Sequence, residues 1–348
     1  MERRSALRLP RRRHRLGEFE LIGKLIEHWY SGPDVLIGPG DDASAVRWAA
    51  AGVVLLQTTD LLIENVHFRR DWGTPRQLGW KALAVNLSDI AAMGGKPLHA
   101  HLNLAIPTSW PQKEILSFQS GFRALAERFG VSLLGGDLSS SPGPLVISVM
   151  VNGCVKAGKA IRRSGAIPGD VIWVSGTLGD AAAGLRLLQS AQRSARFSRH
   201  ERALQKAFLQ PMPEVDLGII CSDSGCVHAM IDLSDGLAGD LGHILELSKV
   251  GAIIESDKLP ISKALSGAAK RHRWKVQELT LQGGEDYRLL GYSPPNAFKR
   301  LNQRVEKELN RSLFPIGEMT AQRGLFLRQQ KGRVLKLKAK SFDHFSST

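Results

Sequence analysis

Six short segments of the sequence place aspartate or glutamate where a carboxylate is costly, at the ends of apolar runs or between glycines. They are GPGDDASAV (38–46), VVLLQTTD (53–60), KALAVNLSDIAAMGG (81–95), LLGGDLSS (133–140), IDLSDGL (231–237) and LQGGEDYRLL (281–290). A buried carboxylate without a partner takes up a proton unless a cation keeps it ionised. Because the chain has a formal net charge of +14, these residues do not belong to a generally acidic surface. The pattern predicts that several of them converge on divalent metal ions.

Two of these segments offer oxygen ligands at the edge of an extended stretch. Thr58, Thr59 and Asp60 place two hydroxyls and a carboxylate at a strand end, and such hard oxygen donors suit Mg²⁺. Neighbouring side chains point to opposite sides of an extended chain, so we expect only one of Asp41 and Asp42 to be a ligand. A capped strand end would also explain the TTD segment taken alone.

Two more segments suggest contacts with a cation or a phosphate. Asp89 lies in a predicted helix whose other positions are apolar or small, which favours a ligand over a surface aspartate. Asp137 follows Gly135 and Gly136, where the backbone can approach a phosphate closely. Gly-Gly-Glu-Asp at 283–286 repeats this combination of glycine and carboxylate.

The segment 231–237 combines carboxylates with a predicted helix start. Asp232 and Asp235 bracket Ser234, and we expect Ser234 or Asp235 to be the N-cap of the helix that follows. The first turn of a helix has free N–H groups that can bind a phosphate, and the flanking carboxylates could hold the metal. The chain has no glycine-rich P-loop, dinucleotide fingerprint or protein-kinase motif. We therefore predict a multi-metal site for nucleotide phosphates, built from carboxylates and glycine backbone.

The composition indicates a globular protein with 43% hydrophobic and 23% charged residues. No apolar run reaches the roughly 20 residues that cross a bilayer, so no membrane contact is expected. Cys154, Cys221 and Cys226 do not form a disulfide framework, which fits a reducing cytoplasm. The arginine-rich residues 1–16 are expected to be a disordered tail, although attraction to polyanions such as nucleic acid is an alternative reading.

Helical and extended patterns alternate along the chain, which predicts an α/β protein of two domains. Expected helices cover 17–30, 75–95 and 113–129, and expected strands cover 53–60, 98–106, 131–135, 144–155 and 170–176. The polar connector 156–168 is the best candidate for a boundary. We thus expect a tail (1–16), an N-terminal ATP- and Mg²⁺-binding domain (17–155) and a C-terminal α/β domain (156–348).

The segments that carry these residues resemble those of the thiamine-monophosphate kinase family. The matching segments are GPGDDA, TTDLLIENVHF, KALAVNLSDIAAMGGKP, GGD, RRSGAIPGD, DLSDGLAGDLGHI and GGEDY. The resemblance extends from GEFELIGKL at position 17 to FDHF at 342–345. Similar acidic motifs recur in the superfamily of aminoimidazole ribonucleotide synthetase and selenophosphate synthetase, but NVHF, GGEDY and DHF point to the thiamine branch.

The resemblance implies an ATP-dependent kinase that converts thiamine monophosphate to thiamine diphosphate, with Mg²⁺ as cofactor and ATP as co-substrate. It also implies a homodimer that pairs through the mixed sheet of the N-terminal domain, with ATP between the two domains. The residues that resemble the family's magnesium ligands are Asp42, Thr58, Thr59, Asp60, Asp89, Asp137, Asp232 and Asp235. Those that resemble its ATP contacts are Gly136, Asp137, Arg163 and Ser234, and those that resemble its thiamine-phosphate contacts are His67, Glu285 and Phe342.

The sequence departs from the family's pattern at three places. LSSS follows GGD where the family usually has threonines and often an arginine, and Arg288 stands where an acidic residue is common. Phe342 replaces a frequent tyrosine or tryptophan, which keeps an aromatic ring but loses a hydrogen bond. None of these departures removes an expected metal ligand.

A phosphate acceptor is already ionised near neutral pH, so the expected transfer is direct and in line, needs no general base and involves several Mg²⁺ ions. Three alternatives remain from the sequence. One is a sister ATP-using enzyme, like aminoimidazole ribonucleotide synthetase or selenophosphate synthetase. Another is a family member that binds thiamine phosphates without turnover. The third is a nucleic-acid binder that uses the basic termini, which we do not expect because no aromatic platform accompanies them.

Overall fold

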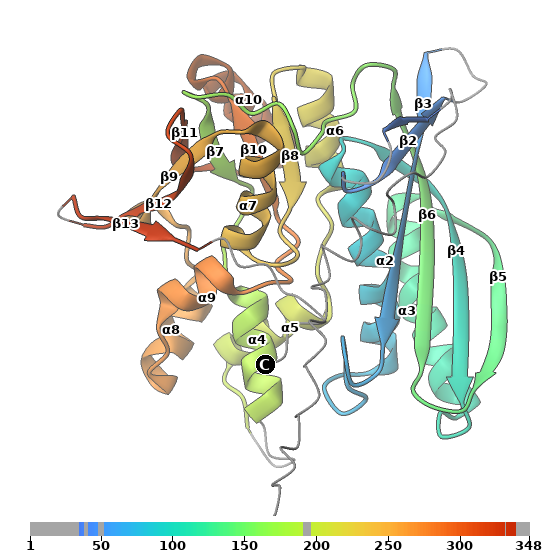
Figure 1. Cartoon of the computed structure of the whole chain (residues 1–348). Helices are drawn as coiled ribbons and strands as arrows, with labels where there is room; N and C mark the ends of the chain where they lie inside the picture. Colours follow the sequence, from blue (N-terminus) through green and yellow to red (C-terminus); the bar gives the residue numbers. More distant parts are fainter. Residues whose placement is uncertain (1–34, 38–40, 48–51, 191–195, 331, 339–348) are drawn as a thin grey trace, which may run out of the picture. The chain divides into compact units, whose positions relative to one another are not determined.

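The computed structural model describes residues 35–37, 41–47, 52–190, 196–330 and 332–338. Within them the chain forms two mixed sheets with helices packed against both. This confirms the α/β class (Figure 1). The expected helix 17–30, the basic tail 1–16 and Phe342 lie outside the described residues. No helix in the described ranges is both long and apolar enough to cross a membrane.

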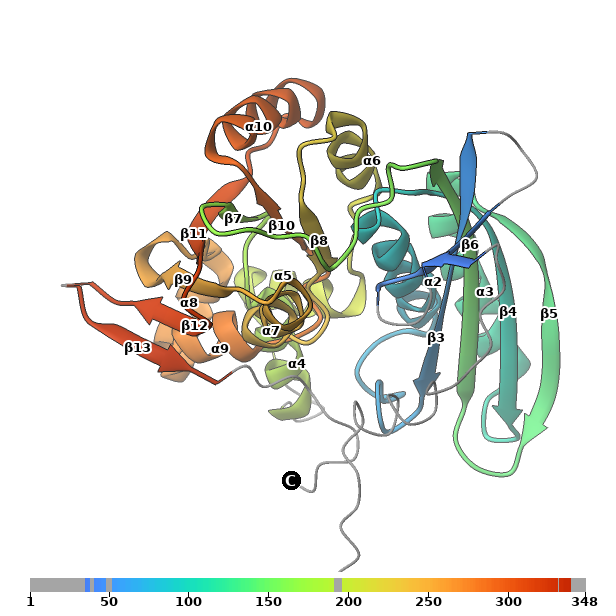
Figure 2. The same ribbon diagram turned by 45° about the horizontal axis from the view of Figure 1, so that its top comes forward.

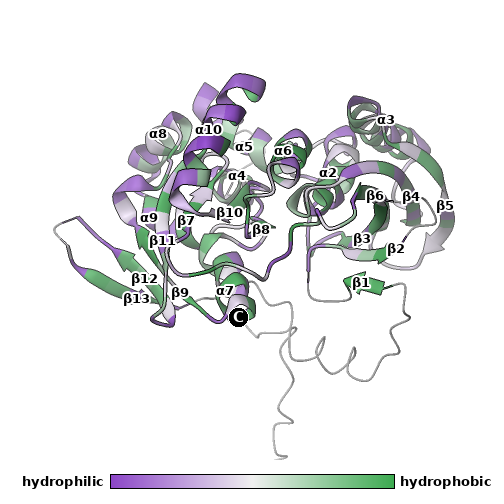
Figure 3. Ribbon diagram, turned by 90° about the horizontal axis from the view of Figure 1, so that it is seen from above, coloured by the Kyte–Doolittle hydropathy of each residue, from purple (hydrophilic) through white to green (hydrophobic). Residues whose placement is uncertain are grey.

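The first sheet has six strands in the order β1-β2-β3-β6-β4-β5, and only β4 and β5 run parallel. Its strands are β1 (Val35–Ile37), β2 (Ser44–Arg47), β3 (Val53–Ile63), β4 (Lys96–Pro107), β5 (Ser132–Ser141) and β6 (Val146–Lys156). Helices α2 (Pro75–Ala92) and α3 (Gln112–Phe129) lie on the same face of this sheet (Figure 3). Figure 2 shows β5 at the outer edge.

The second sheet has seven strands in the order β13-β12-β9-β11-β7-β10-β8, in which only β9 and β12 are parallel neighbours. The strands are β7 (Val171–Val174), β8 (Ala229–Asp232), β9 (Gly251–Glu255), β10 (Leu289–Ser293), β11 (Phe314–Thr320), β12 (Gly324–Arg328) and β13 (Val334–Leu337). The helices around it are α4 (Asp180–Ser190), α5 (Arg199–Leu209), α6 (Val215–Ser224), α7 (Leu237–Ser248), α8 (Lys263–His272), α9 (Val276–Gln282) and α10 (Pro295–Leu309), with a 3₁₀ turn η1 (Ser256–Lys258).

Helix α2 confirms the helix expected after residue 74. Thr74 and Gln77 form a capping box at its start, and Pro75 occupies the first turn, where its missing N–H costs nothing. The helix crosses α3 so closely that a Cβ on Gly79 would lie 1.9 Å from the Phe118 carbonyl oxygen. Most of α2 from Gly79 onward is buried, including polar positions that face the second sheet.

One hydrophobic core continues from the first sheet into the second. Side chains of β3, β6, α2 and α3 share this core with α6, α10 and one face of the second sheet, which contributes Trp173, Met230 and Leu289. The neighbouring Ile172, Ile231 and Leu290 point to the opposite face, where a separate core forms under α7. The described residues all fall in one compact unit, and the boundary expected at 156–168 stays a prediction.

Two local predictions need correction. The strand expected at 131–135 continues to Ser141, so Gly135, Gly136 and Asp137 lie within β5 and not after it. The N-cap of α7 is Gly236, with a φ of 105°. Neither Ser234 nor Asp235 caps this helix, because the buried carboxylate of Asp240 accepts the backbone N–H groups of Asp235 and Gly236 instead.

Candidate metal and phosphate site

Three of the expected ligands come together from distant parts of the chain. Carboxylate oxygens of Asp42, Asp89 and Asp232 all lie within 4.8 Å of one another. Asp42 precedes β2, Asp89 lies near the end of α2, and Asp232 ends β8. We call these three residues the carboxylate cluster. Three anions this close repel one another unless protons or cations reduce their charge.

Hydroxyl groups support two members of the carboxylate cluster. Thr58 donates to Asp89 with an oxygen–oxygen distance of 2.6 Å, and Ser88 donates to Asp232 at the same distance. Ser88 and Asp89 are consecutive on α2, so one rigid helix contacts both β3 and β8. The hydroxyls orient the two carboxylates and satisfy part of their hydrogen-bonding capacity.

Asp60 lies beside the carboxylate cluster, and one of its carboxylate oxygens, Oδ2, is buried without a hydrogen-bond partner among the described residues. Burial raises the pKa of Asp60 to about 6, and burial together with the neighbouring carboxylates raises the pKa of Asp89 well above its usual value. Burial first, and then Asp42, raise the pKa of Asp232 in the same way. An unsatisfied buried oxygen beside converging carboxylates fits a divalent cation with oxygen ligands.

A single guanidinium group supplies positive charge to the cluster. The side chain of Arg163 donates two hydrogen bonds to Asp42, at 3.0 Å from Nε and 2.8 Å from Nη2. The backbone N–H of Arg163 donates to Asp41 at 2.5 Å. The two neighbouring aspartates therefore bind different groups of one residue. A bidentate pair of this kind orients the carboxylate as well as neutralising part of its charge.

Two loops of the second half of the chain are tied together next to the cluster. The backbone N–H of Glu285 donates to the Ser234 carbonyl oxygen at 2.7 Å, and that of Tyr287 donates to the Leu233 carbonyl oxygen at 2.8 Å. Asp286 accepts hydrogen bonds from the N–H groups of Gly179 and Ala181. The GGEDY segment thus fastens the loop after β8 to the start of α4, and Asp286 has a structural role there.

Other predicted residues are not part of the carboxylate cluster. Thr59 follows Thr58 on β3, and its hydroxyl donates to the Val149 carbonyl oxygen of β6. Asp137 is exposed on the edge strand β5. Gly136 has a structural reason to be glycine, since a Cβ there would lie 1.8 Å from the Leu102 carbonyl oxygen of β4. The structure brings none of these three to the cluster, and their roles stay predictions.

Two of the residues expected to contact the thiamine phosphate, His67 and Glu285, have polar partners in the structure. His67 accepts a hydrogen bond from the backbone N–H of Ile63 through Nδ1, at 3.0 Å. Glu285 forms an ion pair with Lys81, at 2.6 Å between Nζ and Oε2. Ser234 and Asp235 lie in the loop between β8 and α7, outside the set of three converging carboxylates.

Ser88, Lys81 and Asp240 were not predicted from the sequence. Ser88 has a weak signal, since it precedes Asp89 in a buried helix. Lys81 lies seven residues before Ser88, which is about two helical turns, so both side chains share one face of α2. Asp240 gives no signal, because its hydrogen bonds depend on the path of the loop before α7.

The raised pKa values predict that the protein without added Mg²⁺ is less stable at pH 8 than at pH 5. Asp60, Asp286, Asp89 and Asp232 keep their protons to higher pH in the folded than in the unfolded state, with pKa values of about 6 for Asp60 and about 7 for Asp286. The folded state therefore binds more protons than the unfolded chain above pH 4, and stability falls as pH rises. Burial lowers the pKa of His243, which acts in the opposite direction below about pH 6.5 but is a single group.

Mg²⁺ is expected to reverse this trend, because metal and protons compete for the same carboxylates. Thermal unfolding followed by circular dichroism should show Mg²⁺ raising Tm by about 5 °C or more at pH 8 and by much less at pH 5. An equal rise at both pH values would show that the cation binds elsewhere.

Comparison with protein families agrees with this arrangement. The family model for the N-terminal domain of AIR synthase related proteins matches residues 40–155, and the model for the C-terminal domain matches residues 168–329. These two matches cover most of both sheets, including all three members of the carboxylate cluster. The two-domain architecture expected from the sequence is confirmed at this level.

Individual relatives show which family of AIR synthase related proteins this chain resembles. The thiamine-monophosphate kinase of Escherichia coli (strain K12) is 38% identical over 339 residues, covering 95% of this chain and 99% of the relative. The structure of AaThiL complexed with AMPPCP and TMP has a TM-score of 0.81 and 32% identity, over 94% of this chain and 97% of that one. The crystal structure of thiamine-monophosphate kinase from Stenotrophomonas maltophilia K279a has a TM-score of 0.73 and 38% identity, over 88% and 94%. This chain belongs to the thiamine-monophosphate kinase family.

Proposed function

We propose that this protein transfers the γ-phosphate of ATP to thiamine monophosphate and forms thiamine diphosphate. The observation that carries the proposal is the convergence of Asp42, Asp89 and Asp232 beside the unsatisfied Asp60. Phosphoryl transfer between two polyanions requires this kind of oxygen-rich cation site. Further support comes from the similarity to AaThiL complexed with AMPPCP, an analogue of ATP, and TMP.

The chemistry of the acceptor determines which protein groups are needed. The attacking atom is a phosphate oxygen that is already ionised near neutral pH, so no side chain has to remove a proton. The task of the site is to bring two anions together in line and to stabilise the charge on the transferring group. We therefore propose direct transfer without a phosphoenzyme.

The residues present fit magnesium ions. Asp42, Asp60, Asp89 and Asp232 would hold them, and Thr58, Thr59, Asp137 and Asp235 are proposed as further ligands. Bound Mg²⁺ supplies positive charge that offsets the repulsion between the two substrates. Gly136, Asp137, Arg163 and Ser234 are the proposed ATP contacts, and His67, Glu285 and Phe342 are the proposed contacts of the thiamine phosphate.

Mass detection of thiamine diphosphate tests the proposal directly. The purified protein is incubated with thiamine monophosphate, ATP and MgCl₂, and parallel reactions contain formylglycinamidine ribonucleotide or selenide as the acceptor. We expect thiamine diphosphate and ADP to form in equal amounts in the first reaction only. ATP consumption that depends on one of the other two substrates would assign the protein to a sister activity, and binding without product would indicate a member that does not turn over.

We also propose that the protein is a homodimer that pairs through its first sheet. Among the strands of the described residues, β5 pairs only with β4, and nearly all of its residues are exposed. Leu133, Leu134 and Leu138 are 50%, 58% and 69% exposed on it. A long edge strand that exposes three leucines is a surface that proteins normally cover. A second copy of the chain is the occupant that the family implies.

Replacing Leu138 by lysine is expected to convert the dimer to a monomer, because the new charge would be buried without a partner at the interface. Size-exclusion chromatography with light scattering gives the mass of each variant. Leu116→Lys on α3 is the control, since Leu116 is 68% exposed on a helix and not on the sheet edge. A dimer that persists in Leu138→Lys would place the interface on another surface.

We also propose how the chain divides into domains and in which cellular compartment the protein lies. The ends of the two family matches, at residues 155 and 168, support a domain boundary in the connector 156–168. The three cysteines are free, which is compatible with the proposed cytoplasmic location, where thiols stay reduced.

A further inference from the structure

Lys81 is a buried lysine whose only described ion-pair partner is one carboxylate. Its side chain is 4% exposed, and its Nζ atom lies 2.6 Å from Oε2 of Glu285, which is 26% exposed. Lysine is almost never buried this deeply unless it is paired. Burial lowers the pKa of Lys81, and Glu285 acts against that shift. The pair therefore joins α2 to the GGEDY segment across a sequence separation of 204 residues.

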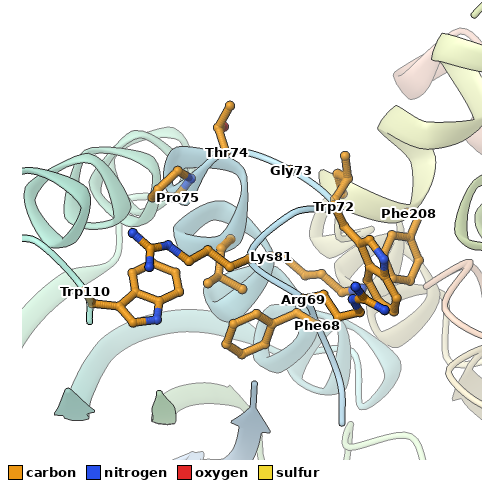
Figure 4. Close-up of a pocket in the computed structure, with 12 residues that line it drawn as sticks. Phe68, Arg69, Trp72, Gly73, Thr74, Pro75, Lys81, Trp110 and Phe208 are labelled. Carbon is orange, nitrogen blue, oxygen red and sulfur yellow. The ribbon is translucent and has the colours of Figure 1, made fainter. Parts of the chain in front are cut away.

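Aromatic side chains hold the Lys81 ammonium group in place. Nζ lies 3.5 Å from the centroid of the Phe208 ring, and Trp72 packs edge-on against the same ring at 5.9 Å. These residues line a small cavity that Figure 4 shows together with Trp110. The cavity has a volume of about 30 Å³, which is room for about two water molecules. Its walls therefore position Lys81.

The backbone of Glu285 is also held in place. Its φ of 69° lies in the left-handed region, which residues other than glycine adopt at a cost. The hydrogen bond from its N–H to the Ser234 carbonyl oxygen holds this conformation. Main chain and one carboxylate oxygen are thus fixed, while the exposed part of the carboxylate remains accessible to a ligand. A constrained, partly exposed anion of this kind is suited to binding a cation or an N–H donor of defined position.

We propose that Lys81 is a positioning residue for the thiamine end of the substrate. This inference rests on the proposed function, since thiamine monophosphate carries a permanently cationic thiazolium ring and an aminopyrimidine. Lys81 holds Oε2 of Glu285, so that the rest of the carboxylate faces the cationic substrate. About 10 Å further along the same helix lie Asp89, a member of the carboxylate cluster, and Ser88, which donates to Asp232. One rigid helix therefore sets the distance between the substrate's ring system and the reacting phosphates.

Steady-state kinetics and calorimetric binding of thiamine monophosphate test the role of Lys81. For Lys81→Met we expect KM and Kd for thiamine monophosphate to rise about tenfold or more, because a fixed charge partner is lost. KM for ATP should stay within about twofold, since the cluster and Arg163 are untouched. Lys113→Met on the exposed side of α3 is the matched control and should behave like the wild type.

A double variant separates positioning from simple loss of stability. If Lys81 acts through Glu285, Lys81→Met should have little further effect on KM in a Glu285→Gln background. An equal tenfold effect in both backgrounds, or a parallel rise in KM for ATP, would overturn the proposal. Should Lys81→Met fail to fold, Lys81→Gln carries the same test, because an amide can still donate to Glu285 without a charge. Wild-type protein that neither binds nor phosphorylates thiamine monophosphate would refute the proposed function itself, whereas an active wild type with an unchanged Lys81→Met refutes only this inference.

Discussion

Replacing Asp60 by asparagine is expected to lower turnover by about two orders of magnitude or more while leaving the fold intact. The buried Oδ2 atom of Asp60 has no described hydrogen-bond partner, and its pKa of about 6 shows that burial opposes its charge. A cation is what would make this carboxylate useful in its ionised form. Asparagine keeps the shape but removes the charge, and losing one such electrostatic group typically costs a factor of 100 to 1,000.

The control is Asp257→Asn, which changes an exposed aspartate in the η1 turn. Both variants should have the circular dichroism spectrum of the wild type, and Asp60→Asn should unfold at the same or a higher temperature without Mg²⁺. Near-normal turnover of Asp60→Asn would remove Asp60 from the site. Turnover lost together with the folded spectrum would show that the residue is structural.

Replacing Arg163 by methionine is expected to have the largest effect on stability. The Asp42 side chain is only 1% exposed, and Arg163 is its bidentate partner. Without the guanidinium, a buried carboxylate would remain next to Asp89 and Asp232. Breaking one side of a buried ion pair costs about 3–5 kcal/mol. Chemical denaturation of the metal-free protein measures this loss as a change in the free energy of unfolding.

Two further variants show whether the loss comes from the unpaired charge. The double variant Arg163→Met with Asp42→Asn should recover most of the stability but little activity, because no anion is left unpaired. Arg304→Met removes a partly exposed pair with Glu308 and should change stability by less than about 1 kcal/mol. If Arg163→Met were as stable as the wild type, solvent or another group would already be neutralising Asp42.

The metal-ligand residues could be predicted from the sequence because the signals that reveal them are local. An aspartate at the end of an apolar strand or inside a buried helix is unusual wherever it occurs, and this predicted Asp89 and Asp232 as ligands of one site although they lie 143 residues apart. The resemblance to the family selected Asp42 over Asp41. The ends of α2 could also be predicted, since Thr74, Pro75 and the paired glycines after residue 93 are local signals of helix termini. Local signals of this kind do not depend on the rest of the fold.

Other features depend on tertiary structure and could not be predicted. Thr58 and Thr59 have similar side chains, and only the pairing of β3 with β6 shows that Thr59 bonds to Val149 while Thr58 supports Asp89. The prediction of Ser234 or Asp235 as the N-cap of α7 was wrong because Asp240, a residue inside the helix, accepts hydrogen bonds from the preceding loop. The partner of Lys81 lies 204 residues away, and no pattern near either residue indicates their contact.

Anomalous scattering from a crystal grown with Mn²⁺ and AMPPCP tests the central claim most directly. The claim is that separated carboxylates of this chain meet around shared cations that carry the nucleotide phosphates. We predict manganese peaks within ligand distance of Asp60 and of the carboxylate cluster, with phosphate oxygens completing the coordination. Clear nucleotide density without a metal peak near Asp42, Asp60, Asp89 or Asp232 would contradict it.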